Sequence, residues 1–192
     1  MKDRLPADLP LRACRLAVPC GTLLLGAAGD ELLYCDWENG WHRAVVQSRI
    51  DRFAGRPFAE VKLESNPLLR ETARQIGEYF AGKRRAFDLP IRFVGTDFQR
   101  AVWEGIKAIP FGSLVTYDDL ARAIGRPAAF RAVGQATGEN PFSIIVPCHR
   151  VVGSARTMTG YGGGYAAKKM LLELEGFTVT GEDGGAAILP RG

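Results

Sequence analysis

FSIIVPCHRVV, residues 142–152, is the stretch from which the fold and the chemistry of this chain can be worked out. Its apolar, largely β-branched first half is typical of a strand buried on both faces. Pro147 cannot donate a hydrogen bond to a central ladder, so we expect the strand to end there. Cys148 follows directly, beside His149 and Arg150, two groups that can favour a thiolate. The alternative is a structural cysteine, because free cysteines are among the most buried residues.

The composition is that of a globular protein with a sizeable core. Of the 192 residues, 46% are hydrophobic and 24% are charged, which allows one large domain or two small ones. The sequence holds neither a membrane-spanning run nor a signal-peptide core, so we expect a cytoplasmic protein. Four irregularly spaced cysteines fit a reducing compartment better than a disulfide framework. Zinc ligation by Cys14, Cys20, Cys35 and His42 matches no standard spacing, so we expect ordinary core cysteines and no zinc site there.

Positive charge is concentrated in the second half of the chain. The net charge is +4 overall. Residues 120–170 hold seven basic side chains and one acidic side chain, Glu139, which leaves a local charge of +6. Such a patch around Cys148 indicates a polyanionic partner.

The pattern of apolar residues predicts an α/β (α+β) fold that divides near residue 90. Residues 1–92 are expected to form a structural domain with a small sheet, helices and a linker, and no recognisable chemistry. Residues 93–180 are expected to form a mostly helical domain with a helix-turn-helix and a short active-site strand. Residues 181–192 are expected to be a flexible tail. The expected strands are 12–18, 22–26 and 31–36, and the expected first helices are 41–53 and 67–81.

Three helices follow the division, and a tight turn joins the last two. Thr96 to Gln99 forms a capping box that opens a first helix. A second helix opens at Thr116 and ends at Gly125, and Pro127 begins a third that runs to Thr137. The two helices on either side of residues 125–127 are typical of a helix-turn-helix, in which the later helix enters DNA. An ordinary helical hairpin has the same pattern.

A carboxylate lies on the apolar face of the last helix. Ala167, Leu171 and Leu174 follow helical spacing, and Glu175 falls on the same stripe. A buried carboxylate is costly without a partner. A hydrogen bond to His149 would relieve that cost and orient the imidazole, giving a nucleophile, a base and an orienting acid. The alternative is that Glu175 reaches solvent from a frayed helix end.

Taken together, these stretches resemble the 6-O-alkylguanine-DNA alkyltransferases, also called methylated-DNA–protein-cysteine methyltransferases. PCHRV, residues 147–151, is similar to the active-site signature of that family. The first 60 residues match only loosely. TGYGGG (159–164) and LLELEG (171–176) are most similar to the bacterial constitutive form. The other motifs are GSLVTY (112–117), RAVG (131–134) and GENP (138–141).

The resemblance implies direct DNA repair by an irreversible, single-turnover transfer that uses no metal or organic cofactor. Cys148 would accept the alkyl group of a flipped 6-O-alkylguanine, with 4-O-alkylthymine as a second candidate substrate. His149, oriented by Glu175, would draw off the thiol proton through a water. Tyr117 would donate a hydrogen bond to the guanine, and Asn140 would brace the turn before the active-site strand. The implied substrate pocket comprises Val151, Tyr161, Gly162 and Ser143.

The resemblance also implies a double-stranded DNA partner, bound through the minor groove. We expect a monomer, and cooperative binding along DNA stays an open alternative. Arg131 would fill the gap left by the flipped nucleotide, while Ala132 and Gly134 would permit close approach to the narrow groove. Three further residues would contact the DNA backbone, namely Gln99, Arg126 and Ser154.

Three departures from the family limit what the resemblance implies. The zinc ligands of animal members do not align here, which again predicts no zinc. Ser143 stands where the animal pocket has a proline, so tolerance for bulky alkyl groups is expected to differ. Phe130 replaces a small residue beside Arg131. It could act as a wedge between base pairs, but we expect it to turn into the core.

Two other classes of function compete with alkyl transfer. A cysteine hydrolase could use Cys148, His149 and Glu175, but it would turn over many times. A non-catalytic lesion sensor of the alkyltransferase-like type would carry another residue at position 148, so the cysteine argues against it.

Overall fold

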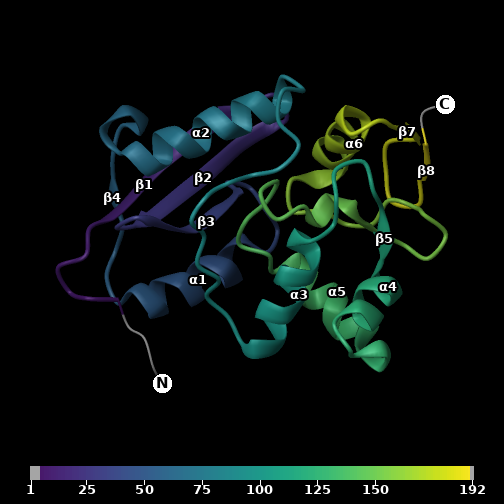
Figure 1. The fold of residues 1–192 in the computed structure, drawn as a ribbon, viewed down its shortest axis with the longest axis horizontal. Coiled ribbons are helices and arrows are strands. Elements are labelled where there is room, and N and C mark those ends of the chain that lie inside the picture. Colours follow the sequence, from purple (N-terminus) through teal and green to yellow (C-terminus); the bar gives the residue numbers. More distant parts are fainter. Residues whose placement is uncertain (1–4, 191–192) are drawn as a thin grey trace.

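The largest sheet carries a helix on each face. The computed structural model describes residues 5–190. In this sheet three antiparallel strands are joined by tight turns and a fourth, short strand runs parallel to the first, giving the order β3-β2-β1-β4. The helices α1 and α2 lie on opposite sides of it (Figure 1). The bounds are β1 (Leu11–Val18), β2 (Gly21–Ala28), β3 (Glu31–Trp37), α1 (Arg43–Ala54), β4 (Ala59–Glu60) and α2 (Pro67–Phe80).

The start and the buried face of α2 follow from its sequence. The Asn66 side chain accepts a hydrogen bond from the backbone N–H of Leu69 at 3.0 Å, and Pro67 occupies the first turn. Leu69, Ile76 and Tyr79 are buried against the sheet at helical spacing. A short 3-10 helix, η1 (Leu63–Ser65), leads into α2.

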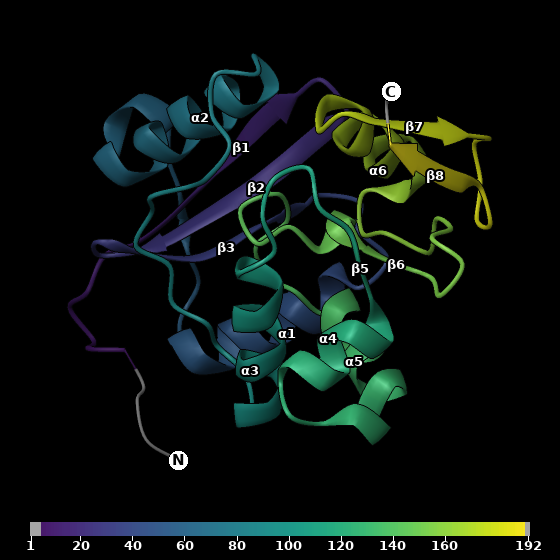
Figure 2. The same ribbon diagram turned by 45° about the vertical axis from the view of Figure 1, so that its right-hand side comes forward.

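Helices predominate in the second half of the chain. Three of them, α3, α4 and α5, pack together below the large sheet, while α6 and a C-terminal hairpin lie at the upper right of the view (Figure 2). The capping boxes at Thr96 and Thr116 are both present. The bounds are α3 (Asp97–Lys107), β5 (Val115–Thr116), α4 (Tyr117–Ala123), η2 (Pro127–Ala129), α5 (Phe130–Gly138), η3 (Cys148–Arg150), β6 (Val151–Val152), α6 (Gly164–Leu174), β7 (Phe177–Thr180) and β8 (Ala187–Pro190).

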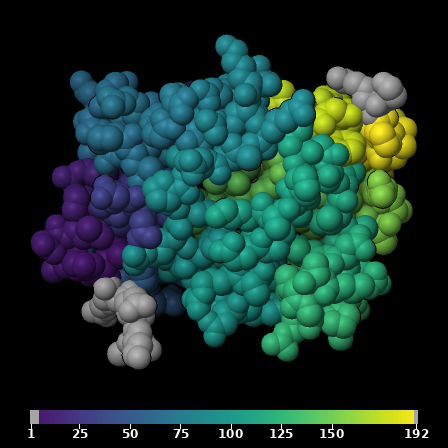
Figure 3. Space-filling view, in the orientation of Figure 1, coloured from purple at the N-terminus to yellow at the C-terminus, as the bar shows by residue number. Residues whose placement is uncertain are grey.

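One hydrophobic cluster spans both halves of the chain. Leu25 and Cys35 of the large sheet share it with Tyr79 of α2, Trp103 of α3 and Phe142. Backbone contacts follow the same path, because the Cys35 N–H donates to the carbonyl of Pro141 at 2.9 Å. In the space-filling view of Figure 3, the early part of the chain lies on the left and the late part on the right, with the teal middle of the chain between them. The mixed α/β architecture predicted from the sequence is therefore confirmed.

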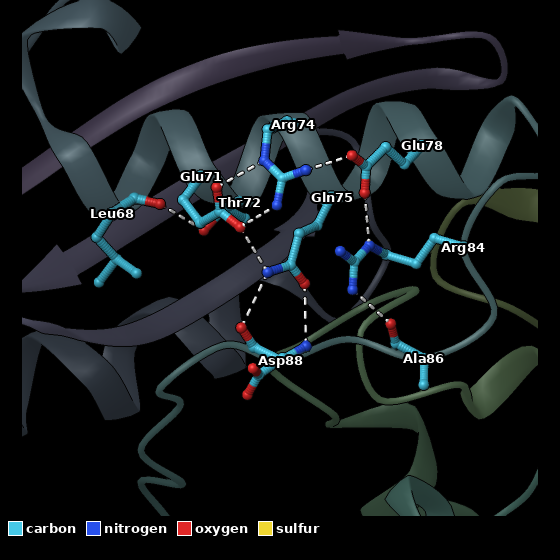
Figure 4. A network of polar contacts seen from close by, with 9 residues as sticks. All are labelled: Leu68, Glu71, Thr72, Arg74, Gln75, Glu78, Arg84, Ala86 and Asp88. Carbon is cyan, nitrogen blue, oxygen red and sulfur yellow. Dashed lines mark hydrogen bonds and ion pairs between the residues drawn. The ribbon is translucent and has the colours of Figure 1, made fainter.

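The segment that connects the halves is fastened to α2 rather than free (Figure 4). Gln75 makes two hydrogen bonds with the backbone of Asp88, at 2.9 and 3.0 Å. Arg84 donates to Glu78 at 2.8 Å and to the carbonyl of Ala86 at 2.9 Å. These contacts fix the path of the chain from α2 toward α3.

Two elements differ from expectation. Residues 142–147 are buried turns and not a strand, since the Asn140 side chain accepts from the Phe142 N–H at 3.0 Å and donates to the Val146 carbonyl at 2.8 Å. The predicted flexible tail also needs correction. Residues 187–190 form β8, which pairs with β7, because Ile188 is buried beside Val179 in a small apolar cluster. Among the described residues, no helix has the length and apolar character needed to cross a membrane.

Candidate active site and DNA interface

The turn segment delivers Cys148 to the first position of η3. Besides the bonds of Asn140, a left-handed backbone at Ile144 (φ 71°) tightens the turns. The Ser143 hydroxyl donates to Asp36 of β3 at 3.0 Å, which anchors the segment to the large sheet. Cys148 follows with 9% of its surface exposed. The nucleophile is therefore held by a rigid loop that is tied to both halves of the molecule.

Behind Cys148, the carboxylate of Glu175 collects four partners. His149 Nε2 lies 2.9 Å from Oε1, so the hydrogen bond expected from the sequence is present. Arg150 donates from Nε at 2.9 and 3.1 Å and from a terminal nitrogen at 2.8 Å. Tyr79 Oη donates at 2.8 Å, and the Gly112 N–H at 3.0 Å. The Glu175 side chain is fully buried, which overturns the alternative of a frayed, solvated end.

Of these partners, the sequence indicated only His149, and Arg150, Tyr79 and the Gly112 N–H were not expected. Arg150 had been assigned to Cys148, and Tyr79 belongs to the half that was expected to hold no chemistry. The buried stripe of α2 was a signal for the burial of Tyr79. Nothing in the spacing indicated that its hydroxyl meets a carboxylate 96 residues away.

The hydrogen bonds and charges of this network strongly favour the ionised form of Glu175. Burial alone would raise the pKa of Glu175, but the hydrogen bonds and charges of His149 and Arg150 outweigh it and lower the pKa to about 2. Burial lowers the pKa of His149 against the opposing pull of Glu175, which favours a neutral imidazole at pH 7. A neutral ring with Nε2 bound to Glu175 has Nδ1 left as a proton acceptor, and Nδ1 has no hydrogen-bond partner within residues 5–190.

The resting thiol is not activated in the way that its neighbours suggested. Burial raises the pKa of Cys148 to about 11, and the nearby Asn140 amide and the Lys168 charge oppose this only in part. Nε2 of His149 and the Arg150 guanidinium are bonded to Glu175 and not to the sulfur. The thiol proton must therefore leave during the reaction itself, and the site needs a base.

Cys148 opens into a cavity of about 290 Å³ between the two halves of the chain. Tyr161 and Gly162 of the expected substrate pocket line it, together with Tyr117 and with Gly134, which was expected to face DNA. Ser143 and Val151 are buried and are not part of the lining. The remaining lining residues are Trp41, His42, Thr137, Gly138 and Gly160. Trp41 and His42 come from the half that sequence analysis treated as packing only.

A polar chain runs from the cavity wall to a buried cation. Tyr117 Oη lies 2.9 Å from Thr159 Oγ1. Lys168 Nζ lies 3.2 Å from the same hydroxyl and donates to the Val151 carbonyl at 2.9 Å. Burial lowers the pKa of Lys168 to about 8, although the Cys148 charge opposes this. Burial also raises the pKa of Tyr117, so its phenol is a hydrogen donor at neutral pH.

The residues expected to bind DNA occupy two kinds of position. Arg126, Arg131, Ala132 and Ser154 are exposed, and Gly134 is half-buried beside the cavity. Gln99 is half-buried and already engaged. It completes the Thr96 capping box and donates to Glu139 at 2.7 Å.

Phe130 corrects an expectation. It was expected to turn into the core, yet 45% of its surface is exposed at the first position of α5. The Arg131 guanidinium lies 5.6 Å from the centre of its ring. Phe130 lies at the junction of η2 and α5, where helical spacing alone does not tell which side of the chain faces the core.

Comparison with known proteins places this geometry in a family. The DNA-binding domain of 6-O-methylguanine DNA methyltransferase matches residues 97–177, and the ribonuclease-like domain of the same proteins matches residues 15–93. The chain is 49% identical to the methylated-DNA–protein-cysteine methyltransferase of Methanosarcina barkeri, over 82% of this chain and 92% of that protein. The chain belongs to the 6-O-methylguanine DNA methyltransferase family.

Other members of the family share the sequence and the fold. The Haemophilus influenzae methylated-DNA–protein-cysteine methyltransferase is 39% identical over 82% of each chain. The crystal structure of Mycobacterium tuberculosis OGT in complex with DNA superposes with a TM-score of 0.73 at 35% identity, covering 85% of this chain and 92% of that one. In the described part of the chain, no group of three or more His, Cys, Asp or Glu side chains is placed to hold a metal ion.

Proposed function

We propose that the protein repairs double-stranded DNA by moving the alkyl group of 6-O-alkylguanine to the sulfur of Cys148. The observation that carries this function is Cys148 at a cavity, backed by a His149–Glu175 pair with a Nε2–Oε1 distance of 2.9 Å. The carbon–oxygen bond of the lesion breaks and a carbon–sulfur bond forms. The sulfur loses its hydrogen, and the guanine regains one. A thioether is a poor leaving group, so the protein reacts once.

The proton path follows from the ring orientation of His149. Nε2 is committed to Glu175, which leaves Nδ1 to accept the thiol proton, directly or through a water. Ionised Glu175 then stabilises the imidazolium. At the other side of the cavity, Tyr117 donates a hydrogen bond to the departing guanine, supported by Thr159 and Lys168.

DNA binds through α4 and α5 as a helix-turn-helix, and the damaged nucleotide flips into the cavity. Arg131 fills the space that the nucleotide leaves, and small Ala132 and Gly134 allow α5 to approach the minor groove. Arg126 and Ser154 contact phosphates. We propose a monomer in the reducing cytosol, in keeping with four free cysteines. Duplex titration on longer DNA measures whether binding is cooperative. Intact-mass analysis with DNA that carries 4-O-alkylthymine measures whether that base is a substrate.

Intact-mass analysis after incubation with DNA that carries 6-O-methylguanine tests the function. We expect one methyl group per protein molecule, placed on Cys148 by peptide mapping. Cys148→Ala should abolish transfer but keep duplex binding. Methylation of Cys14, Cys20 or Cys35 would contradict the assignment. Repeated turnover would indicate a hydrolase instead, and binding without transfer would indicate a lesion sensor.

A further inference from the structure

An exposed tryptophan stands at the mouth of the cavity. Trp41 follows β3 and has 71% of its surface exposed, whereas Trp37 and Trp103 are buried. Together with Tyr161 and Gly162 it lines the Cys148 cavity and a neighbouring one of about 400 Å³. The indole therefore lies between the two cavities. A large apolar ring left open to solvent beside a reactive group suggests a surface that is covered when the substrate is bound.

The ring is held from behind by His42. The two rings pack edge to face with centroids 5.1 Å apart. A Cβ at Gly162 would lie 2.4 Å from His42 Cε1, so the imidazole is wedged against a backbone that has no room for a side chain. His42 is buried, and neither of its ring nitrogens has a hydrogen-bond partner in the described part of the chain. Its Nε2 lies 3.5 Å from Asp36 Oδ1.

The same ring also touches the recognition helix. A Cβ at Gly138, the last residue of α5, would lie 3.0 Å from the indole. Trp41 therefore packs between the N-terminal half and the end of the helix that we assign to DNA. Gly138 adds no side chain to the cavity wall beside the indole. Among the large aromatic side chains that line the cavity, Trp41, Tyr117 and Tyr161, Trp41 is the exposed one.

Building on the proposed function, we propose that Trp41 forms the outer wall of the substrate pocket and contacts the O6 substituent of the flipped guanine. His42 acts as its positioning residue. The contact favours large, aromatic substituents of the benzyl class, because aromatic pairs gain from offset or edge-to-face packing. A methyl group has no aromatic ring and gains nothing from such packing. The N-terminal half would thereby set substrate preference.

The test is the ratio of single-turnover rates on 6-O-benzylguanine and 6-O-methylguanine placed in the same duplex. Trp41→Ala should lower the benzyl-to-methyl ratio by about tenfold, the equivalent of one aromatic contact. Trp41→Phe should retain most of the ratio, and Val45→Ala is the matched control. Val45 is 54% exposed on α1 but does not line the cavity. A ratio for Trp41→Ala within twofold of the parent would overturn the proposal.

Free 6-O-benzylguanine separates a pocket wall from a DNA contact. Trp41→Ala should slow the reaction with the free base about as much as with benzylated duplex. Weaker duplex binding with an unchanged free-base rate would show that Trp41 meets DNA, and the proposal would fail. Methyl transfer by the parent protein reports the proposed function independently of either result.

Intrinsic fluorescence gives a second readout. In a Cys148→Ala background the free base cannot react, and Trp41 is the exposed tryptophan of the described chain. Adding 6-O-benzylguanine should quench the emission, and Trp41→Phe should remove that quenching. Equal quenching in both backgrounds would contradict a contact with the indole.

Discussion

Glu175 shows how a single buried carboxylate can serve folding and chemistry at once. It neutralises Arg150, orients His149 and accepts from Tyr79, all within the interior. A buried charge of this kind is tolerated only when its lone pairs are used. Its position fixes which nitrogen of His149 is left for the thiol.

Glu175→Gln should slow alkyl transfer by at least about tenfold, because the imidazolium loses its counter-charge. It should also lower the free energy of unfolding by about 3–5 kcal/mol, since Arg150 is left buried without its partner. Single-turnover rates below the melting temperature, corrected for the folded fraction, measure the first effect. Tyr79→Phe is the matched control, since it removes one donor to the carboxylate but no charge. An unchanged corrected rate for Glu175→Gln would remove the base-orienting role.

Phe130→Ala should leave stability within about 1 kcal/mol of the parent, because the ring is half-exposed. If the ring is inserted between base pairs, the variant will repair duplex DNA several-fold more slowly and bind it more weakly. Chemical denaturation and duplex titration measure the two effects. A large loss of stability would indicate that Phe130 packs in the core. Normal duplex repair would show that the ring does not insert between base pairs.

Arg131→Ala should impair repair of duplex DNA far more than reaction with free 6-O-benzylguanine. A free base needs no flipping, so an exposed side chain that fills the vacated stack has no role there. Parallel single-turnover rates on the two substrates decide the matter. Equal losses would place Arg131 in the chemical step or in folding.

At the scale of elements, the segment of residues 141–147 matters most. Its composition is that of a buried strand, but its backbone follows turns. Buried backbone groups need partners wherever they lie. Here they find them in short backbone bonds, such as the one from the Val146 N–H to the Phe142 carbonyl at 2.8 Å, and in the side chain of Asn140. A loop of this kind can present Cys148 at an angle that a straight strand could not.

Asn140→Ala should lower the free energy of unfolding by about 1–3 kcal/mol, since it leaves the buried N–H of Phe142 unpaired and removes one of the two donors to the Val146 carbonyl. Transfer should fall even in the folded protein, because Cys148 loses its placement. Urea denaturation and corrected single-turnover rates measure the two losses. Asn66→Ala removes the cap of α2 and should cost only about 1 kcal/mol with transfer intact. Full activity of folded Asn140→Ala would show that the loop keeps its shape unaided.

At the scale of the whole molecule, the shared core couples both halves to the site. Tyr79, Asp36 and Trp41 come from the first half, and each touches or faces a residue of the second. The division predicted at residue 92 stays a prediction about organisation along the chain. The cavity itself exists only where the halves meet.

Acid should destabilise the fold through this shared interior. The pKa of Glu175 is lowered to about 2 in the folded state, against about 4.3 in an unfolded chain. Its contribution is thus present above pH 4.3 and is lost as the pH falls toward 2. The loss is on the order of 3 kcal/mol. The lowered pKa of His149 acts in the same direction, from near pH 6.5 downward. Melting temperatures across pH 7 to 2 measure the loss. The profile should be shallower in Glu175→Gln, and identical profiles would contradict the assignment.

The sequence was sufficient where a local pattern carries the physics. Apolar spacing and caps predicted α2, α3 and α4 to within a few residues. Spacing also placed Glu175 on a buried face, and with only two histidines in the chain His149 was the natural partner. The tail was mispredicted because pairing of residues 187–190 with β7 depends on a cluster formed by distant residues.

What the sequence by itself determined is the set of reactive groups and the faces on which they are buried, because periodicity and capping act over a few residues. Tertiary structure alone decided what those faces meet. It turned Arg150 away from the thiol, so that burial raises the pKa of Cys148. It also brought Tyr79 to Glu175 and Trp41 to the cavity. Such contacts depend on how whole elements pack, and no short stretch of sequence encodes the partner that packing will supply.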